Sequence, residues 1–130
     1  MVLDTSALVA YLEQEPEAAR VEAALAAAPR LLISAVTVVE AGIVVEARRG
    51  EAAGRELDLL LHRLHVDVVP VGETHADLAR SAWRRFGKGR HPAGLNFGDC
   101  FAYALAAETG EPLLFVGSDF ARTDIHPALT

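Results

Sequence analysis

The sequence predicts an α/β fold, a three-layer α/β/α domain with a mostly parallel central sheet. Four short apolar runs resemble buried strands, and helical patterns of roughly 8 to 15 residues separate them. Connections of that length favour parallel crossovers over hairpins, with helices covering both faces of the sheet. The length of 130 residues and the 52% hydrophobic content suffice for one core. We therefore expect residues 1–130 to form a single domain.

The amino-terminal segment predicts a strand that ends at an acid. Residues 2–4 form a minimal apolar strand closed by Asp4. Residues 6–13 predict a short helix, capped by Thr5 or Ser6. Ligands of open α/β sheets gather at the carboxyl ends of the strands, so the position of Asp4 indicates a functional carboxylate.

The next elements alternate in the same way. Pro16 suits the first turn of a helix that runs to about Ala28, and residues 31–33 predict a second buried strand. Residues 35–49 are rich in β-branched residues, yet they are too long for an ordinary strand. We predict a helix there, with Ser34 as its cap and Gly50 as its stop. The face expected to pack on the sheet holds Val36, Val39, Glu40, Ile43 and Ala47.

The second half of the chain continues the alternation. Residues 51–64 predict a helix with one apolar stripe, formed by Leu57, Leu60, Leu61 and Leu64. Residues 66–71 predict a third strand, which a proline restricts to an edge or terminates. Residues 73–86 predict a helix with Thr74 as a cap, and the glycine-rich segment 87–94 predicts a loop.

The last third supplies a helix and the final strands. Residues 98–109 predict an alanine-rich helix that stops at Gly110, and residues 113–116 predict the fourth strand. A further short strand is expected near Ile125. The lone Cys100 excludes an internal disulfide and suits a reducing compartment, where we expect it to be a small buried hydrophobe.

Composition limits the location and the partners. No uncharged apolar run approaches the ~18 residues of a membrane span, and no basic segment precedes the first apolar stretch. We expect a cytoplasmic protein with no membrane association. The net charge of −6 argues mildly against nucleic acid, because phosphate binding normally requires a basic surface.

One segment of opposite charge stands out against this background. Basic residues cluster within eight positions, at Arg84, Arg85, Lys88, Arg90 and His91. Such a cluster is either a solvated helix end or a seat for a polyanion. Nearby aromatic side chains could stack on bases, although core packing is the simpler interpretation for Trp83, Phe86 and Phe97.

Four acids lie within or directly after apolar sequence, and they carry the chemical prediction: Asp4, Glu40, Asp99 and Asp119. An ionised carboxylate on a packed face is costly unless it is paired or bound to a metal. Carboxylates that converge repel one another, and a hard divalent cation relieves that repulsion. Mg²⁺ prefers oxygen ligands and keeps several waters, and two such ions can promote hydrolysis of a phosphodiester. The sequence lacks the cysteine pairs and histidine motifs of zinc sites.

At this point the chain resembles the VapC toxins of the PIN-domain ribonucleases. The resemblance covers essentially the whole chain, and the segments that carry it are residues 2–7 (VLDTSA), Glu40, residues 95–106 (LNFGDCFAYALA) and residues 113–120 (LLFVGSDF). It implies a Mg²⁺-dependent endoribonuclease, with Mn²⁺ as the alternative ion, that cuts structured cellular RNA such as tRNA or rRNA. It also implies inhibition by a VapB-type antitoxin and assembly into a homodimer.

The resemblance also assigns roles to individual residues. Asp4 and Asp99 match the central metal ligands, and Glu40 matches the helix acid that completes the pocket. Thr5 and Ser6 match strand-end hydroxyls that orient the first acid or a bound water. Apart from the resemblance, the position of Asn96 predicts that it caps or braces the Asp99 helix, with a substrate contact as the alternative. Many relatives have an acid where this chain has Gly117, so the fourth acid is Asp119 or Asp124, or the site uses three acids.

Other interpretations of the same residues remain open. Asp4 and Asp99 could serve only as a helix cap and a helix-dipole partner, and Glu40 could be a surface residue. The chain could be a catalytically weak PIN-like binding module that acts through its antitoxin or dimer surface. A phosphatase of the haloacid dehalogenase type also uses a strand-end aspartate, but it requires a second acid where this chain has Ser6.

Overall fold

The structure, a computed structural model, describes residues 1–129 of the chain. Its helices and strands alternate along the sequence, as predicted. In chain order they are β1 Val2–Leu3, α1 Thr5–Leu12, α2 Ala18–Ala27, β2 Leu32–Ser34, α3 Ala35–Arg49, α4 Glu51–Arg63, β3 Asp67–Val69, α5 Glu73–Phe86, α6 Phe97–Thr109, β4 Leu113–Leu114 and the 3₁₀ turn η1 Phe120–Arg122.

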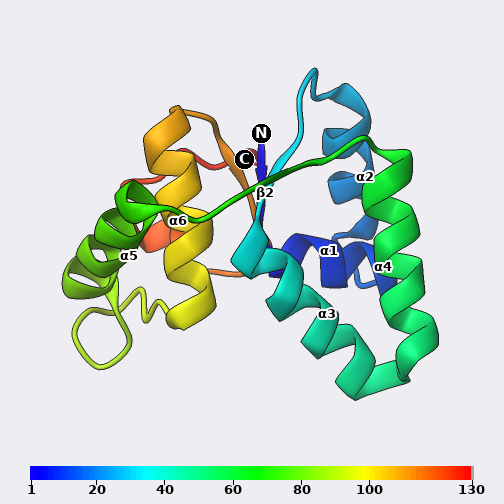
Figure 1. Ribbon diagram of the computed structural model, residues 1–130, viewed down its shortest axis with the longest axis horizontal. Helices are drawn as coiled ribbons and strands as arrows, with labels where there is room; N and C mark the ends of the chain where they lie inside the picture. The colour runs from blue at the N-terminus through cyan, green and yellow to red at the C-terminus, as the bar shows by residue number, and fades with distance from the viewer. Residues whose placement is uncertain (130) are drawn as a thin grey trace.

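The four strands form one parallel sheet in the order β3-β2-β1-β4. Helices α1 to α4 lie on one side of this sheet, and α5 and α6 lie on the other (Figure 1). The three-layer α/β/α prediction is confirmed. The amino-terminal strand β1 lies between β2 and β4 and runs parallel to both, so the carboxyl ends of β1 and β4 are neighbours.

Each face of the sheet has its own apolar cluster, because side chains alternate across a strand. Leu3 and Ile33 face the cluster under α1 to α4, whereas Val2 and Leu32 face the cluster under α5 and α6. All four side chains are fully buried or nearly so. This two-sided burial explains why the strands read as continuous apolar runs rather than alternating ones.

Several predicted boundaries are wrong by a few residues. Asp4, and not Thr5 or Ser6, caps α1, because its carboxylate accepts the backbone N–H of Ser6. Pro16 lies before α2 rather than in its first turn. Helix α5 starts at Glu73 without a side-chain cap, so Thr74 does not cap it.

The predicted strands are also shorter in the structure. The third strand is reduced to Asp67–Val69 and the fourth to Leu113–Leu114. The third strand lies at an edge of the sheet, as its proline predicted. Within residues 1–129 no strand forms at Ile125, although Pro127 makes a single bridge to Leu113. Short strands suffice because the flanking helices supply most of the packing surface.

The predicted orientation of α3 is wrong. Its buried residues are Thr37, Ala41 and Val45, while Val39 and Ile43 are 60% and 64% exposed. Valines occupy both sides of this helix, so hydrophobic periodicity does not single out one face. The smaller Thr37 and Ala41 permit the close approach to neighbouring elements that the larger residues would prevent.

Candidate functional site

A hollow of about 330 Å³ lies where β1 and β4 end, and it gathers three of the four predicted acids. We call it the acid pocket. It is lined by Asp4, Thr5, Ser6, Val9, Glu15, Glu40, Val44, Arg48, Asn96, Asp99 and Val116. These residues belong to α1, α3 and α6 and to the segments that follow β1, α1 and β4 or precede α6, which the parallel topology brings to one edge of the sheet.

Asp4 is held at the bottom of the acid pocket by the turn into α1. Its Oδ2 accepts the backbone N–H and the hydroxyl of Ser6, at 3.0 and 2.6 Å. The Ser6 hydroxyl oxygen accepts in turn the N–H of Val116 at 3.0 Å, which ties β4 to this corner. The Asp4 Oδ1 is buried without a hydrogen-bond partner in the described chain. Burial raises the pKa of Asp4 to about 6.

Asp99 occupies the first turn of α6 and completes a capping box. Its N–H donates to Asn96 Oδ1 at 2.9 Å, and its Oδ2 accepts the Asn96 N–H at 3.0 Å. Burial raises the pKa of Asp99 to about 7, and the Asn96 N–H opposes that rise. The negative charges of Asp4 and Glu40 add to the effect of burial. The helix cap and the crowding of acids therefore coexist at Asp99.

Glu40 reaches the acid pocket from α3, although the face on which we expected it is not the packed one. Its Oε1 accepts the Thr5 hydroxyl at 2.5 Å. Its carboxylate lies against the backbone of Gly98, where an added Cβ would be only 1.8 Å from Glu40 Oε2. Gly98 therefore leaves the space that Glu40 occupies. Sequence reasoning did not identify this role, for which the only signal is a glycine inside a helical turn beside Asp99.

The two candidates for the fourth acid behave differently. Asp119 is exposed and does not line the acid pocket, yet its charge contributes to the raised pKa of Asp99. Asp124 is bound elsewhere, because its carboxylate accepts the Tyr103 hydroxyl at 2.7 Å and pairs with Arg85 at 2.9 Å. These contacts hold the pKa of Asp124 below its usual range even though partial burial opposes them.

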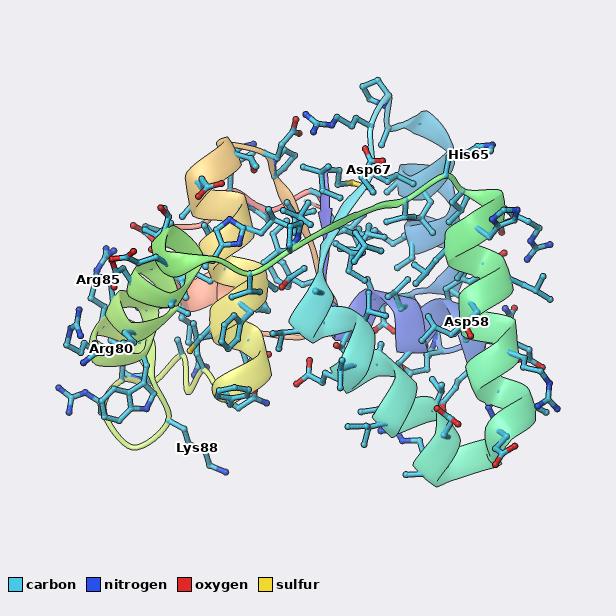
Figure 2. The ribbon with its side chains drawn as sticks, in the orientation of Figure 1. Asp58, His65, Asp67, Arg80, Arg85 and Lys88 are labelled. Atoms are coloured by element: carbon cyan, nitrogen blue, oxygen red, sulfur yellow. The ribbon has the colours of Figure 1, made fainter. Side chains whose placement is uncertain are left out.

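The predicted basic cluster is divided among several partners. Arg85 pairs with Asp124, and Arg90 stacks on the Trp83 ring at 4.7 Å and donates to the carbonyl of Arg84. Lys88 is exposed on the loop after α5 and extends away from the ribbon (Figure 2). The acid pocket contains a different cation that we did not assign to it, Arg48, which pairs with Glu13 at 2.8 Å.

The aromatic residues near the basic loop are only partly in the core. Phe86 is buried, but Trp83 is 46% exposed and Phe97 is 76% exposed. Together with Phe101 and Arg80, the two exposed rings line an apolar hollow of about 740 Å³ between α5 and α6. The core-packing interpretation was therefore correct for Phe86 and wrong for Trp83 and Phe97.

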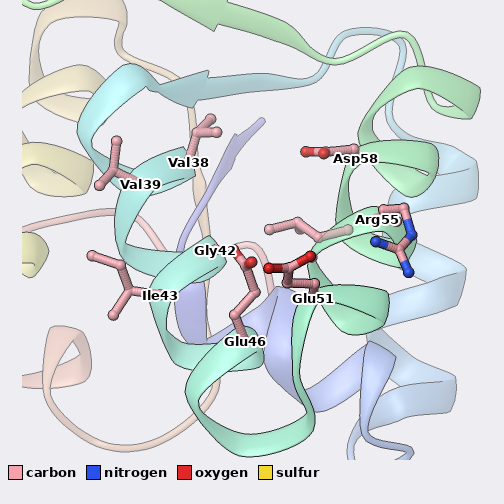
Figure 3. A pocket seen from close by; sticks show the side chains of 10 residues that line it. Val38, Val39, Gly42, Ile43, Glu46, Glu51, Arg55 and Asp58 are labelled. Carbon is pink, nitrogen blue, oxygen red and sulfur yellow. The ribbon is translucent and has the colours of Figure 1, made fainter.

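A further hollow of about 420 Å³ separates α3 from α4 (Figure 3). The carboxylates of Glu46 and Glu51 lie close together there, whereas the Arg55 guanidinium extends away from them. Val39 and Ile43 also border the hollow, but their side chains extend toward the other side of α3.

Cys100 is buried, and burial raises the pKa of its thiol to about 11. A thiol with so high a pKa is a poor nucleophile, so Cys100 is a packing residue, as predicted.

The donor set of the acid pocket fits a hard divalent cation that retains water. Among residues 1–129, no three His, Cys, Asp or Glu side chains are close enough to hold a metal ion by themselves. Mg²⁺ usually takes one or two carboxylates and completes its shell with water. The unpartnered, buried Asp4 Oδ1 and the raised pKa of Asp99 are the features that such an ion would relieve.

Comparison with known proteins identifies the family. The PIN domain model matches residues 1–126. The chain therefore belongs to the PIN-domain family. Ribonuclease VapC30 of Mycobacterium tuberculosis is 58% identical over 125 residues, which cover 96% of this chain and 95% of that protein. Ribonuclease VapC of Mycolicibacterium smegmatis is 56% identical, over 96% of this chain and 97% of the relative. This similarity places the chain among the VapC ribonucleases, as the motifs predicted.

Solved structures show the same fold at lower identity. The Mycobacterium tuberculosis toxin VapC20, described as cleaving the sarcin–ricin loop, has a TM-score of 0.78 and 20% identity, over 99% of this chain and 98% of that one. A toxin–antitoxin complex from Klebsiella pneumoniae gives a TM-score of 0.67 and 19% identity, over 95% of this chain and 92% of that one.

Among residues 1–129, no helix has the length and apolar character needed to cross a membrane.

Proposed function

We propose that this chain is the toxin of a VapBC-type system, a Mg²⁺-dependent endoribonuclease that hydrolyses phosphodiester bonds in cellular RNA, either tRNA or rRNA. One observation carries the proposal. Two buried carboxylates, Asp4 and Asp99, share the acid pocket and both have a raised pKa. A fold rarely retains such groups without a function, because each burial destabilises the protein at neutral pH.

Each of the four acids has a role in binding the cation. Asp4 and Asp99 would be the central ligands, Glu40 would complete the pocket from α3, and Asp119 would act as the fourth acid from the β4 side. The bound ion would supply Lewis-acid activation of water and charge neutralisation at the phosphate. Mn²⁺ offers similar coordination and is the alternative ion.

The remaining residues of the acid pocket orient these acids. The Ser6 hydroxyl fixes one oxygen of Asp4 and leaves Oδ1 free, and the Thr5 hydroxyl holds Glu40. Asn96 uses its Oδ1 to cap α6, which keeps the Asp99 backbone in place. We assign RNA backbone contacts to two exposed cations of the predicted cluster, Lys88 and Arg84, because they line the hollow between α5 and α6 that also includes Asn96.

Two protein partners are part of the proposal. We propose that a small VapB-type antitoxin inhibits the chain, because the 58%-identical relatives are VapC proteins and one neighbour of the same fold was solved as a toxin–antitoxin complex. We also propose a homodimer, formed through the apolar face of Val39, Ile43 and Phe97. These three side chains are each at least 60% exposed, and they line one shared hollow next to the acid pocket.

The direct test is cleavage by the Asp99→Asn variant. The purified protein and the variant are incubated with total RNA, a DNA duplex and a small phosphate ester, with and without Mg²⁺. We expect the wild type to cut only RNA, and only with the metal. The variant should retain its fold, because asparagine can also accept the capping N–H of Asn96. Unaltered RNA cleavage by Asp99→Asn would exclude the acid pocket as the active site.

A further inference from the structure

The tail after β4 is joined to α5 and α6 by a polar cluster that the proposed chemistry does not use. Tyr103 Oη donates to Asp124 Oδ1 at 2.7 Å, and Arg85 Nη2 donates to Asp124 Oδ2 at 2.9 Å. Arg85 Nη1 also donates to Tyr103 Oη at 3.1 Å. We call Arg85, Tyr103 and Asp124 the anchor cluster. Its three members come from different segments, and each contacts the other two.

Both carboxylate oxygens of Asp124 accept a hydrogen bond within the anchor cluster. The Arg85 guanidinium donates to both of the other members and lies over the Phe86 ring at 4.7 Å. Neither residue lines the acid pocket. These contacts favour a structural role for both residues over the metal-binding and phosphate-binding roles that sequence patterns allowed for them.

Exposed ion pairs contribute little to stability, so stabilisation alone is a weak explanation for this arrangement. The side chains of Arg85 and Asp124 are 51% and 53% exposed. Pairs at such exposure are usually worth less than about 1 kcal/mol. What the cluster does achieve is geometric, because it fixes the far end of an irregular segment to two long helices.

That segment carries Asp119. It leaves β4 through Gly117, whose φ of +103° turns the chain sharply, and its only regular element is the three-residue turn η1. Phe120 is buried against Phe115, which fixes the start of η1, and Arg122 donates to the carbonyl of Pro92 at 3.1 Å. No side-chain hydrogen bond or ion pair holds the Asp119 carboxylate among residues 1–129, so the path of the backbone sets the region that this carboxylate can reach.

The near end of the same segment borders the acid pocket. Val116 lines that pocket and donates to the Ser6 hydroxyl, while Asp4 N–H donates to the carbonyl of Leu114 at 3.0 Å. Asp119 therefore sits three residues from the pocket wall, between a fixed start at Val116 and the anchor cluster at Asp124.

We infer that the anchor cluster is a positioning device, in which Arg85 and Tyr103 act through Asp124 to hold the Asp119 carboxylate toward the acid pocket. This inference rests on the proposed function, because it assumes that Asp119 acts there as the fourth acid. It assigns Asp124 to positioning and not to the metal, and it removes Arg85 from the set of RNA-contacting cations. Partners that orient ligands in this way typically change metal affinity or activity by about 10- to 100-fold.

The experiment compares Asp124→Asn and Tyr103→Phe with a matched control, Glu56→Gln. Glu56 forms a similarly exposed pair with Arg49 at 3.2 Å, on α3 and α4 and away from the tail. Two quantities are measured: the Mg²⁺ concentration that gives half-maximal RNA cleavage, and the shift of the melting temperature on adding Mn²⁺. We expect Asp124→Asn to raise the first by about 10-fold and to reduce the second, with Tyr103→Phe intermediate. Without metal, all three should melt within a few degrees of the wild type.

A double-mutant cycle separates positioning from a general structural role. If Asp124 acts through Asp119, then adding Asp124→Asn to Asp119→Asn should cause no further loss of cleavage or of the Mn²⁺ shift. Additive losses would overturn the inference, as would an Asp124→Asn protein that matches the control in both measurements. Should the wild type cut no RNA, the ribonuclease proposal fails, and the Mn²⁺ shifts alone still decide the role of the anchor cluster.

Discussion

Replacing Asp4 by asparagine should stabilise the metal-free protein at neutral pH. Burial raises the pKa of Asp4 from 3.8 to about 6, a change of about 2.2 pH units. At 1.36 kcal/mol per unit, keeping this carboxylate ionised in the folded state costs about 3 kcal/mol. The folded state binds more protons than the unfolded state between these two values. The free energy of unfolding should therefore fall as pH rises from about 4 to about 6, and remain low above that.

Asparagine removes the charge but not the unpaired position. It caps a helix as well as aspartate does, so α1 should retain its start. The atom at the position of Asp4 Oδ1 has no protein partner in either protein, so the cost of that unpaired position largely cancels in the comparison. The expected gain for Asp4→Asn is therefore up to about 3 kcal/mol in the absence of metal.

The assay is urea unfolding at about pH 5 and about pH 7.5, in EDTA and in Mg²⁺. In EDTA the wild type should become less stable from the lower to the higher pH, and Asp4→Asn should lose less stability over the same interval. The loss that remains in the variant comes from Asp99, whose pKa is also raised, to about 7. In Mg²⁺ the order should reverse, since a bound ion stabilises only the protein that binds it. The control is Asp58→Asn, an exposed acid on α4 (Figure 2). An Asp4→Asn protein less stable than the wild type in EDTA at about pH 7.5 would refute this reasoning.

Two further substitutions test the packing around the acid pocket. Gly98→Ala should displace the flexible Glu40 carboxylate from its present position and lower RNA cleavage by at least about 10-fold. The free energy of unfolding in urea should change by less than about 1 kcal/mol, because alanine favours the helix. Normal cleavage by this variant would show that Glu40 has no fixed role. Phe97→Ser should convert the proposed homodimer to a monomer, as measured by light scattering. The control Leu59→Ser, at an exposed site on α4, should leave the dimer intact. A Phe97→Ser protein that is still a dimer would show that another face forms the interface.

Local sequence patterns were sufficient for the architecture and for the central acids. The alternation of apolar runs and helical segments predicted the parallel sheet, because each element must bury one face against another layer. Asp4 was found because an acid ends an apolar strand, and Asp99 because an acid follows a helix cap. Both signals lie within a few residues, which is the range over which sequence pattern predicts structure.

The helix that carries Glu40 shows where such patterns fail. Valines surround α3, so its period did not reveal that Thr37, Ala41 and Val45 face inward. That choice depends on which side chains allow neighbouring helices and strands to approach closely. Glu40 enters the acid pocket because this orientation, together with the space left by Gly98, directs it there. Neither condition is visible in the residues around position 40.

The functional acids of this protein can be recognised from their neighbours in the sequence, whereas the residues that contact them are determined by the tertiary packing. A carboxylate at the end of a strand can be recognised from its neighbours, since strand and cap are local structures. Whether Asp124 faces a metal or Arg85 depends on contacts between residues 39 positions apart, and the same holds for Glu40 and Thr5, 35 positions apart. Such long-range contacts arise only when the layers pack, because burial and not local propensity selects them.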